Sequence, residues 1–473
     1  MSDTTQGDHA HEEEDVSGVL ADFVSGLAFA DLPAAVVEAA KLHLLDALGV
    51  AAAGSTAEGI DLLIDQIDAW GGTPEAHVLG TDLRVPAPWA ALANGAQIHA
   101  KEFEDVHEIA FARPAGAVIP SVLAAAERGV GVTGEDVIAG IVGGYEFISR
   151  IGRGIDGPIG FTRSGALGAL AGAAAAARVL RLDAERTRHA VGIAFAQAST
   201  SIQAQLDAAM VKKLHPGFGA HAAMISVALA ERGMTGNINS LEGQYGYLKL
   251  YEQNPYDRDA MVNGLGTSWE ILETGFKLFP CAVYTHAPVA AALDAHAAGV
   301  EARRIRSVRF SVAEFAAIAG AKSFAEVERN PPLESMFSIP YLASAGFFRG
   351  HVGLDDLLVE NILAPEVADL ARRIEVVIDP DLPADAFVPI GMHVVLDDGS
   401  VLDREVDVLP GSPRDDVAPA TIEEKFRGCL DHVRTVAPDG GRWTSVDGDR
   451  LISAVRGIDR SASPAADLLA ALG

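Results

Sequence analysis

Histidines and carboxylates crowd one short segment of an otherwise apolar sequence. In HAKEFEDVHE, nine residues carry His99, Glu102, Glu104, Asp105 and His107. If this segment is helical, His99 and Glu102 share one face and Glu104 and His107 another. Imidazoles and carboxylates at such spacing can bind a metal ion or supply a general base. A solvated helix end has the same pattern, so the segment alone leaves all three interpretations open.

Two further polar segments contain lysine, which this chain rarely uses. KKLHPG carries Lys212, Lys213 and His215, and FKLFPCAVYTHA carries Lys277, although the chain has only eight lysines against 28 arginines. Arginine keeps its proton near neutral pH, whereas a partly buried lysine beside another cation can lose one. The lysines therefore favour proton-transfer chemistry. The simpler alternative, electrostatic attraction, also predicts an anionic ligand.

The sequence lacks complete motifs for the common cofactors. GVGVTG, residues 129–134, has the glycine spacing of a dinucleotide site, but the preceding SVLAAAER has a helical pattern where that motif requires a strand. A turn that ends a helix explains these glycines. The sequence has no phosphate-binding loop with Lys and Ser or Thr, no zinc-type spacing and no nucleophile elbow. We therefore expect neither a metal nor an organic cofactor.

Composition excludes several classes of partner. The 473 residues are 49% hydrophobic and 21% charged, which predicts two or three globular domains. A formal net charge of −29 argues against nucleic acid and anionic membranes as partners. The apolar runs are too short to span a bilayer. The two distant cysteines, Cys281 and Cys429, and an acidic N-terminus without a signal pattern lead us to expect a cytoplasmic protein.

The hydrophobic pattern predicts a mainly α protein with a large all-helical domain and a smaller α/β domain. Residues 17–250 repeat Ala- and Leu-rich stretches closed by Gly or opened by capping residues, such as Asp31 and Thr133. Later segments alternate as strands, and one contains a hairpin turn at residues 397–399. The expected divisions are a disordered tail 1–15, a helical domain 16–273, an α/β domain 274–410 and a C-terminal helical segment 411–473.

Several segments together resemble the MmgE/PrpD family, which includes 2-methylcitrate dehydratase, cis-aconitate decarboxylase and iminodisuccinate epimerase. The likeness covers nearly the whole chain and is carried by LHLLDALGVAAAGS, ALANGAQIHAKEFEDVHE, GYEFISRIGRG, KKLHPGFGAHAAMISVALAERGMTG, SLEGQYGYLKLY and FKLFPCAVYTHA. The resemblance implies an α/β domain that acts as a lid, a final helical segment that returns to the first domain, and a homodimer. It also implies a site between the domains without metal or organic cofactor.

Some positions match the family motifs and others depart from them. The resemblance implies that Lys212 and Lys277 contact substrate and that Tyr341, in FSIPY, lies near the site. Five positions differ: Glu102 stands for the usual Asp, Val106 for Thr, Arg113 and Thr162 for His, and Ala282 for the His of the decarboxylase branch. The expected pocket therefore has fewer histidines and more fixed positive charge.

Positive side chains in the expected site predict a small anionic substrate. Arg113 and Arg163 suit bidentate carboxylate binding, and Lys213, His215 and His107 are further candidates for contacts to a di- or tricarboxylate.

Proton transfer is assigned to four other residues. Lys212 or Glu102 is the candidate base that removes a proton next to a carboxylate, and Lys277 or Tyr341 is the candidate that stabilises the enediolate or returns a proton.

The carbanion formed in this way leads to several outcomes. Dehydration ranks first because it is the outcome that the range of family members favours. We therefore predict a lyase similar to 2-methylcitrate dehydratase. Epimerisation ranks second because it makes less demand on the missing histidines, and decarboxylation ranks third because position 282 is Ala. A carboxylate-binding protein without catalysis is a further alternative. So is a metal enzyme that uses His99, Glu102 and His107.

Overall fold

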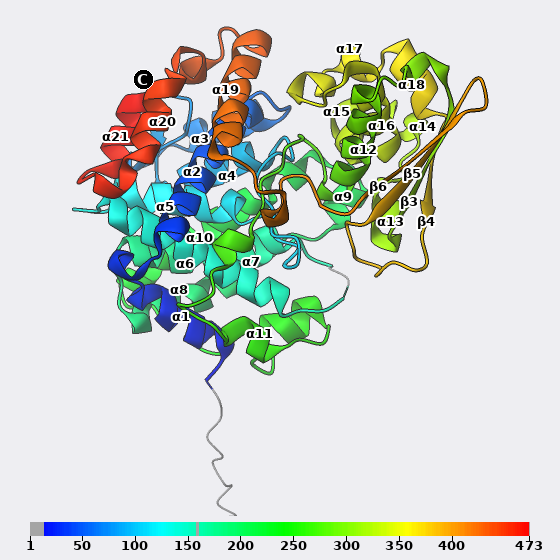
Figure 1. Cartoon of the computed structure of the whole chain (residues 1–473). Coiled ribbons are helices and arrows are strands. Elements are labelled where there is room, and N and C mark those ends of the chain that lie inside the picture. Colours follow the sequence, from blue (N-terminus) through cyan, green and yellow to red (C-terminus); the bar gives the residue numbers. More distant parts are fainter. Residues whose placement is uncertain (1–13, 158–159, 473) are drawn as a thin grey trace, which may run out of the picture.

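The computed structural model describes residues 14–157 and 160–472 (Figure 1). Most of the predicted disordered tail, residues 1–13, lies outside the described residues. Asp15, which that prediction included, instead caps the first helix, α1 (Val16–Gly26): its carboxylate accepts a hydrogen bond from the Ser17 amide at 2.9 Å. Asp15 is buried. It therefore belongs to the helical domain.

The helical domain is built around two helices, α7 (Arg163–Val179) and α10 (His215–Glu231), which pack against each other. Glycine permits their close approach, because a Cβ atom on Gly165 would lie 2.9 Å from the carbonyl oxygen of His215. The contact brings the N-terminal end of α7 beside the N-terminal end of α10. This arrangement positions Thr162 and His215, which line one cavity.

Further helices surround this pair and match the alanine- and leucine-rich stretches of the sequence. They are α2 (Ala34–Gly54), α3 (Ile60–Trp70), α4 (Ala87–His99), α5 (Ala115–Arg128), α6 (Gly134–Arg153), α8 (Ala184–Phe195), α9 (Gln203–Leu206) and α11 (Arg258–Val262), with a small strand pair, β1 (Ala76–His77) and β2 (Arg84–Val85). In GVGVTG, Gly129 and Gly131 lie between α5 and α6 and Gly134 begins α6, so the segment is a turn between helices and not the strand-to-helix turn of a dinucleotide site.

Two predicted helix starts have different outcomes. Thr133 begins α6 with a capping box: its hydroxyl accepts from the Asp136 amide while the Asp136 carboxylate accepts from the Thr133 amide, as expected from the sequence TGED. Asp31 does not cap α2. It lies in a separate short turn, and the chain runs through extended residues Leu32 and Pro33 before α2 begins. The Asp31 side chain is therefore displaced from the free amides of that helix.

The second domain contains a four-stranded sheet with the order β4-β3-β5-β6. Strand β3 (Ile305–Val312) pairs in parallel with β4 (Ile374–Ile378) and antiparallel with β5 (Ile390–Leu396). Strands β5 and β6 (Val401–Val406) form the predicted hairpin, in which Ile390 is opposite Val406 and Gly399 has a φ of +83°. The sheet is mixed, because β3 and β4 are parallel whereas the other two pairs are antiparallel.

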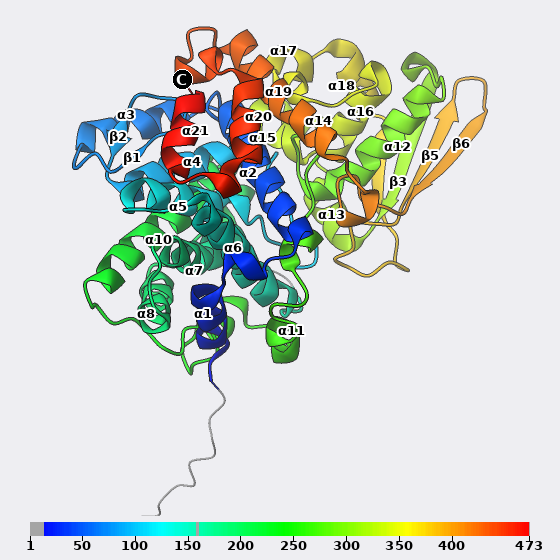
Figure 2. The same cartoon turned by 60° about the vertical axis from the view of Figure 1, so that its left-hand side comes forward.

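Helices pack on this sheet and complete the α/β domain (Figure 2). The two main ones, α12 and α16, pack against each other, with α12 also contacting β5 and β6 and α16 contacting β4. The helices of this domain are α12 (His286–Ala297), α13 (Glu314–Gly320), α14 (Phe324–Val327), α15 (Pro331–Glu334), α16 (Ile339–Arg349), α17 (Val359–Ile362) and α18 (Pro365–Ala371). The fold is therefore mainly α, with one smaller α/β domain.

The C-terminal helices pack on the first domain, as the orange and red ribbons beside α2 show (Figure 1). They are α19 (Pro419–Val436), α20 (Gly448–Arg456) and α21 (Pro464–Leu472). Phe426, Trp443 and Leu451 of this segment are buried in the same hydrophobic core as α2 and α6. A buried ion pair of 2.6 Å between Lys425 and Asp46 adds a polar contact.

Two chain crossings connect the domains and pair with neighbouring backbone. Gly275 and Val106 exchange backbone hydrogen bonds of 2.8 and 3.0 Å, and the Phe276 amide donates to the Gly411 carbonyl at 2.8 Å. The crossing at residues 274–278 thus lies directly beside the segment that carries Glu102. No helix in the described part of the chain is long and apolar enough to cross a membrane.

Candidate active site

The segment HAKEFEDVHE leaves the helical conformation at its start. Helix α4 ends at His99, and Glu102 has a φ of +50°, a backbone conformation that is rare for residues other than glycine. Lys277 contacts this turn, because its Nζ donates to the Glu102 carbonyl at 2.8 Å and to Glu102 Oε2 at 3.1 Å. The helical interpretation of the segment is therefore wrong after His99. The turn at Glu102 is contacted by Lys277, which comes from a distant part of the chain.

Three cationic side chains surround the buried carboxylate of Glu102. Lys212, from the short helix η2 (Met210–Leu214), forms an ion pair with Oε1, and Lys277, from the domain crossing, forms one with Oε2. The Arg113 guanidinium lies 3.6 Å from Oε2 and 3.8 Å from Oε1 of Glu104. The structure thus brings together Lys212, Lys277, Glu102 and Arg113, which lie far apart in the sequence.

His99 connects Lys212 to a second buried carboxylate. Its Nδ1 contacts Glu104 Oε1, and its Nε2 lies 3.0 Å from the Nζ of Lys212. Burial and the nearby Lys212 charge lower the pKa of His99 well below its usual value, so the ring is neutral. A neutral ring in this position donates from Nδ1 to Glu104 and accepts at Nε2 from Lys212. Glu102 and His99 then use two of the three N–H groups of a Lys212 ammonium.

Burial changes the proton affinities of both lysines. Burial, with the neighbouring charge of Lys277, lowers the pKa of Lys212 well below the usual lysine range. Burial and the Arg113 charge lower the pKa of Lys277 to about 7. Burial also raises the pKa of Glu104. These shifts have the direction expected for lysines that exchange protons near neutral pH.

A cavity of about 480 Å³ lies beside this cluster, between the two domains. The helical domain contributes His99, Arg113, Lys212 and His215, whereas Glu102 and Lys277 are not part of the lining. The complete lining contains His99, Val106, Phe111, Arg113, Thr162, Arg163, Ser164, Ile202, Gln205, Leu206, Lys212, His215, Pro216, Ala282, Val283, Tyr284, Phe315, Ile318, Ala319, Ala321, Lys322, Glu326, Phe337 and Phe387.

Arg113, Thr162 and Ala282, the three positions at which the resemblance predicted His, all line the same cavity. Thr162 Oγ1 lies 3.1 Å from Nδ1 of His215. Burial and the charge of Lys212 lower the pKa of His215 to about 4, so this ring is neutral as well. The cavity therefore contains neutral imidazoles at positions 99 and 215 and none at 162 or 282.

Arg163 and Lys213, two predicted substrate-binding residues, have protein partners. Arg163 forms two hydrogen bonds of 3.1 Å with the Glu252 carboxylate and donates to two backbone carbonyls. It borders the cavity, but its charge is balanced by Glu252. Lys213 lies outside the lining and donates to the Glu58 carbonyl at 2.9 Å.

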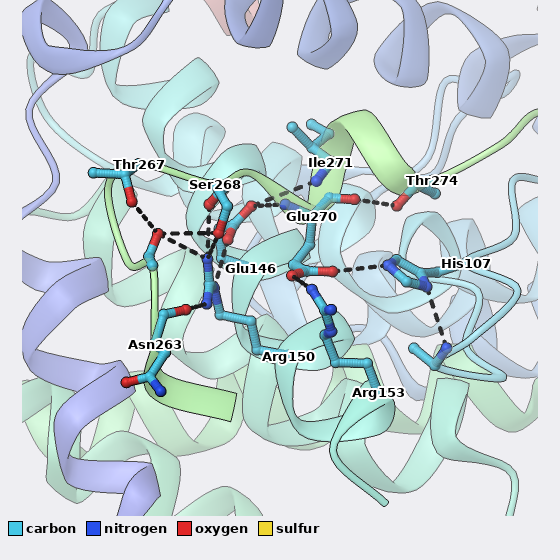
Figure 3. Close-up of polar contacts among 12 residues, drawn as sticks. His107, Glu146, Arg150, Arg153, Asn263, Thr267, Ser268, Glu270, Ile271 and Thr274 are labelled. Carbon is cyan, nitrogen blue, oxygen red and sulfur yellow. Dashed lines mark hydrogen bonds and ion pairs between the residues drawn. The ribbon is translucent and has the colours of Figure 1, made fainter. Parts of the chain in front are cut away.

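Tyr341 and His107 also lie away from the cavity lining. The Tyr341 hydroxyl donates to the Asp356 carbonyl, and the ring is buried in the core of the α/β domain. His107 Nε2 lies 3.0 Å from the Glu270 carboxylate, and its Nδ1 accepts from the Ala110 amide (Figure 3). The structure therefore separates His107 from His99 and Glu102. Among the described residues, no group of three or more His, Cys, Asp or Glu side chains is arranged to hold a metal ion.

His107 belongs to a second buried ionic network, which we call the Arg150 network (Figure 3). It consists of His107, Glu146, Arg150, Arg153 and Glu270. Arg150 donates to Glu146 at 2.7 Å and to backbone carbonyls of Asn263 and Ser268, while Glu270 contacts both His107 and Arg153. These contacts hold residues 263–274, the segment that leads into the domain crossing.

Sequence reasoning did not identify the apolar lining of the cavity. Phe315 and Phe387 belong to the α/β domain, and Phe111 belongs to the helical domain, yet their rings meet. No local pattern distinguishes these residues from ordinary core phenylalanines. Ser164 was missed as well: its hydroxyl accepts from the Arg113 amide at 2.9 Å and ties Arg113 to the start of α7.

Comparison with known protein families gives the class of this protein. The model of the MmgE/PrpD N-terminal domain matches residues 18–258, and that of the MmgE/PrpD C-terminal domain matches residues 279–441. The chain belongs to the MmgE/PrpD family.

Individual relatives narrow the class of reaction. The chain is 28% identical to a cis-aconitate decarboxylase of Aspergillus terreus over 392 residues, which cover 78% of this chain and 80% of the relative. It is 27% identical to the cis-aconitate decarboxylase of Homo sapiens over 418 residues, or 85% of each chain. The family and these relatives indicate a lyase-type enzyme.

Proposed function

We propose that this enzyme removes a proton next to a carboxylate of a small di- or tricarboxylate and then expels a β-hydroxyl group, as a dehydratase does. The observation that carries the proposal is the position of Lys212. Its ammonium group lines the interdomain cavity, pairs with Glu102 and His99, and has Arg113 as a neighbour in the lining.

Arg113 is the candidate group that binds a substrate carboxylate. Its guanidinium lies beyond hydrogen-bonding distance of Glu102 and Glu104, and its buried Nε has no hydrogen-bond partner within the described residues. A guanidinium keeps its charge at any physiological pH and presents paired N–H groups to a carboxylate. Arg113 can therefore accept an anionic ligand without first losing a protein hydrogen bond.

Lys212 is the candidate base. Its lowered pKa increases the neutral amine fraction near neutral pH, and the amine can take the proton next to the bound carboxylate. Glu102 does not line the cavity, so it serves better as the partner that stabilises the new Lys212 ammonium. Lys277 lies outside the cavity lining and donates to both the carbonyl and the carboxylate of Glu102. It is thus a positioning residue.

The second half of the reaction restores the base. The electron pair left on carbon forms a double bond as the bond to the β-hydroxyl group breaks. The Lys212 ammonium donates its proton to the departing oxygen, which leaves as water. Positive charge from Arg113 and Lys212 stabilises the enediolate formed between the two steps. Atoms and protons balance without any further reactant.

Decarboxylation is the second candidate, because the relatives bear the name cis-aconitate decarboxylase. Ala282 and Thr162 in the cavity lining weigh against it, since neither can deliver a proton as a His does. The same observation favours epimerisation as a third candidate, because it removes one proton, returns one to the opposite face and expels no group, and so makes less demand on the missing histidines.

Nuclear magnetic resonance in heavy water distinguishes these reactions. The purified enzyme is incubated with 2-methylcitrate, citrate, cis-aconitate and iminodisuccinate, and deuterium uptake and products are followed. Loss or addition of water with deuterium at the neighbouring carbon supports the dehydratase. Loss of carbon dioxide supports decarboxylation, and exchange with inversion supports epimerisation. Calorimetric binding of any of these acids without exchange or turnover supports a carboxylate-binding protein and contradicts the enzymatic proposal.

A further inference from the structure

The interdomain cavity is lined by a polar cluster and by a larger set of apolar residues. The polar cluster contains His99, Arg113, Lys212 and His215, and most other lining residues are apolar. We propose that the substrate joins a head of one or two carboxylates to an apolar tail, aliphatic or aromatic, that lies against the apolar set. The inference rests on the proposed function for the head and adds the chemical class of the remainder of the substrate.

The apolar set includes an aromatic wall that both domains build. The ring of Phe111, from the helical domain, lies 5.7 Å from that of Phe315 and 5.2 Å from that of Phe387. The rings of Tyr284 and Phe315 are 5.8 Å apart in an edge-to-face arrangement. Such a surface binds hydrocarbon well but gives no partner to a carboxylate or hydroxyl group, whose desolvation is costly.

The apolar wall continues to solvent-exposed residues at the cavity. Leu206 of α9 is 72% exposed and Ile318 of α13 is 75% exposed, and both line the cavity from different domains. Single exposed aliphatic residues are common on protein surfaces. Leu206 and Ile318, however, line the same cavity as the aromatic wall. Together they provide an apolar path along which a hydrocarbon chain could extend toward solvent.

The number of cations in the lining limits the number of substrate carboxylates. Of the four lysine and arginine side chains in the lining, Arg113 and Lys212 lie in the cluster around Glu102. Each of these two can bind one substrate carboxylate.

The remaining cations of the lining are already paired. Arg163 is balanced by Glu252, and Lys322 forms an ion pair with Glu334 while Glu326 also lines the cavity. A third substrate carboxylate would therefore meet no unpaired cation among the described residues. This charge count favours a head of one or two carboxylates over a tricarboxylate.

Calorimetry with unreactive acids tests the tail. The probes are succinate, butylsuccinate, hexylsuccinate and propane-1,2,3-tricarboxylate. We expect each added methylene to tighten binding by about two- to fourfold, as burial of hydrocarbon does, and we expect the tricarboxylate to bind no more tightly than succinate. Equal affinity for the three succinates, or tenfold tighter binding of the tricarboxylate, overturns the inference.

Rim variants locate the tail. Leu206→Ser combined with Ile318→Ser is expected to remove part of the affinity gained between succinate and hexylsuccinate, because the aromatic wall remains intact. The control is Leu62→Ser, because Leu62 is 64% exposed on α3 and does not line the cavity; it should retain the whole gain. Retention of the gain in the rim variant overturns the inference. If succinate binds but chain length has no effect on affinity, only the inference of an apolar tail is contradicted. If none of the acids binds, the carboxylate site of the proposed function is contradicted as well.

Discussion

The carboxylate of Glu102 and the carboxylates of Glu146 and Glu270 are all buried, but their cationic partners differ. Glu102 is held by Lys212 and Lys277 beside the interdomain cavity. In the Arg150 network, by contrast, arginines hold the carboxylates, and Arg150 also donates to backbone carbonyls (Figure 3). None of the residues of that network lines the cavity.

The difference shows how the choice of cation separates chemistry from structure. Arg150 has a planar group with five donors, so it can satisfy Glu146 and several carbonyls at once and stay charged. Lysine is a single ammonium whose proton can be lost when burial lowers its pKa, as for Lys277 at about 7. We infer that the Arg150 network stabilises the fold, that Lys212 transfers the proton, and that Lys277 positions Glu102 beside it.

Removing the cavity-facing lysine is expected to have the largest effect on activity. Lys212→Met should lower kcat by about 1,000-fold, within the range for loss of a general base, while circular dichroism stays unchanged. Lys213→Met is the matched control, because the adjacent lysine lies outside the lining and donates to the Glu58 carbonyl. Equal losses of kcat in the two variants would contradict the assignment of Lys212 as the base.

Removing the central arginine of the other network should affect stability instead. Arg150→Met leaves Glu146 buried without its partner, which typically costs about 3–5 kcal/mol of unfolding free energy. Urea denaturation measures this loss, and kcat per folded molecule should remain close to the wild-type value. A variant of unchanged stability but greatly reduced kcat would place the Arg150 network in the reaction.

Substitution of Arg113 should mainly weaken substrate binding. Because its charge is fixed and its Nε lacks a partner in the described chain, Arg113→Met should raise KM by about 10- to 100-fold, the scale of a lost charge-assisted hydrogen bond. Steady-state kinetics gives the split between KM and kcat. Arg113→Lys should recover only part of the loss because it cannot bind a carboxylate through two N–H groups. A change confined to kcat contradicts this role.

The pH dependence of activity should report on Lys277. If neutral Lys212 is the base, kcat/KM rises with pH through the lowered pKa of Lys212. The charge of Lys277 contributes to that lowering, so Lys277→Met should raise the pKa of Lys212 and move the rising limb to higher pH. A pH–rate profile checks the direction. An unchanged limb with reduced kcat would mean that Lys277 acts only through the backbone of Glu102.

Local sequence signals predicted much of the fold. Thr133 and Asp136 lie three residues apart and form their capping box within one turn, and the hairpin at residues 397–399 follows from turn residues between alternating strands. The unusual use of lysine also singled out Lys212 and Lys277, which both contact Glu102 in the structure. These features depend on neighbours in sequence or on residue type, and so they are visible before folding.

The sequence by itself determined the helical and α/β elements, the family and the presence of a lysine-rich site. Only the tertiary structure decided that Glu102 leaves the helix at a φ of +50°, that Arg163 pairs with Glu252, and that Phe111 meets Phe315 and Phe387. Each of these depends on partners far away in the chain. A residue's own neighbours fix its backbone preference and solvation, but its final hydrogen-bond and packing partners depend on which distant segments the fold brings together.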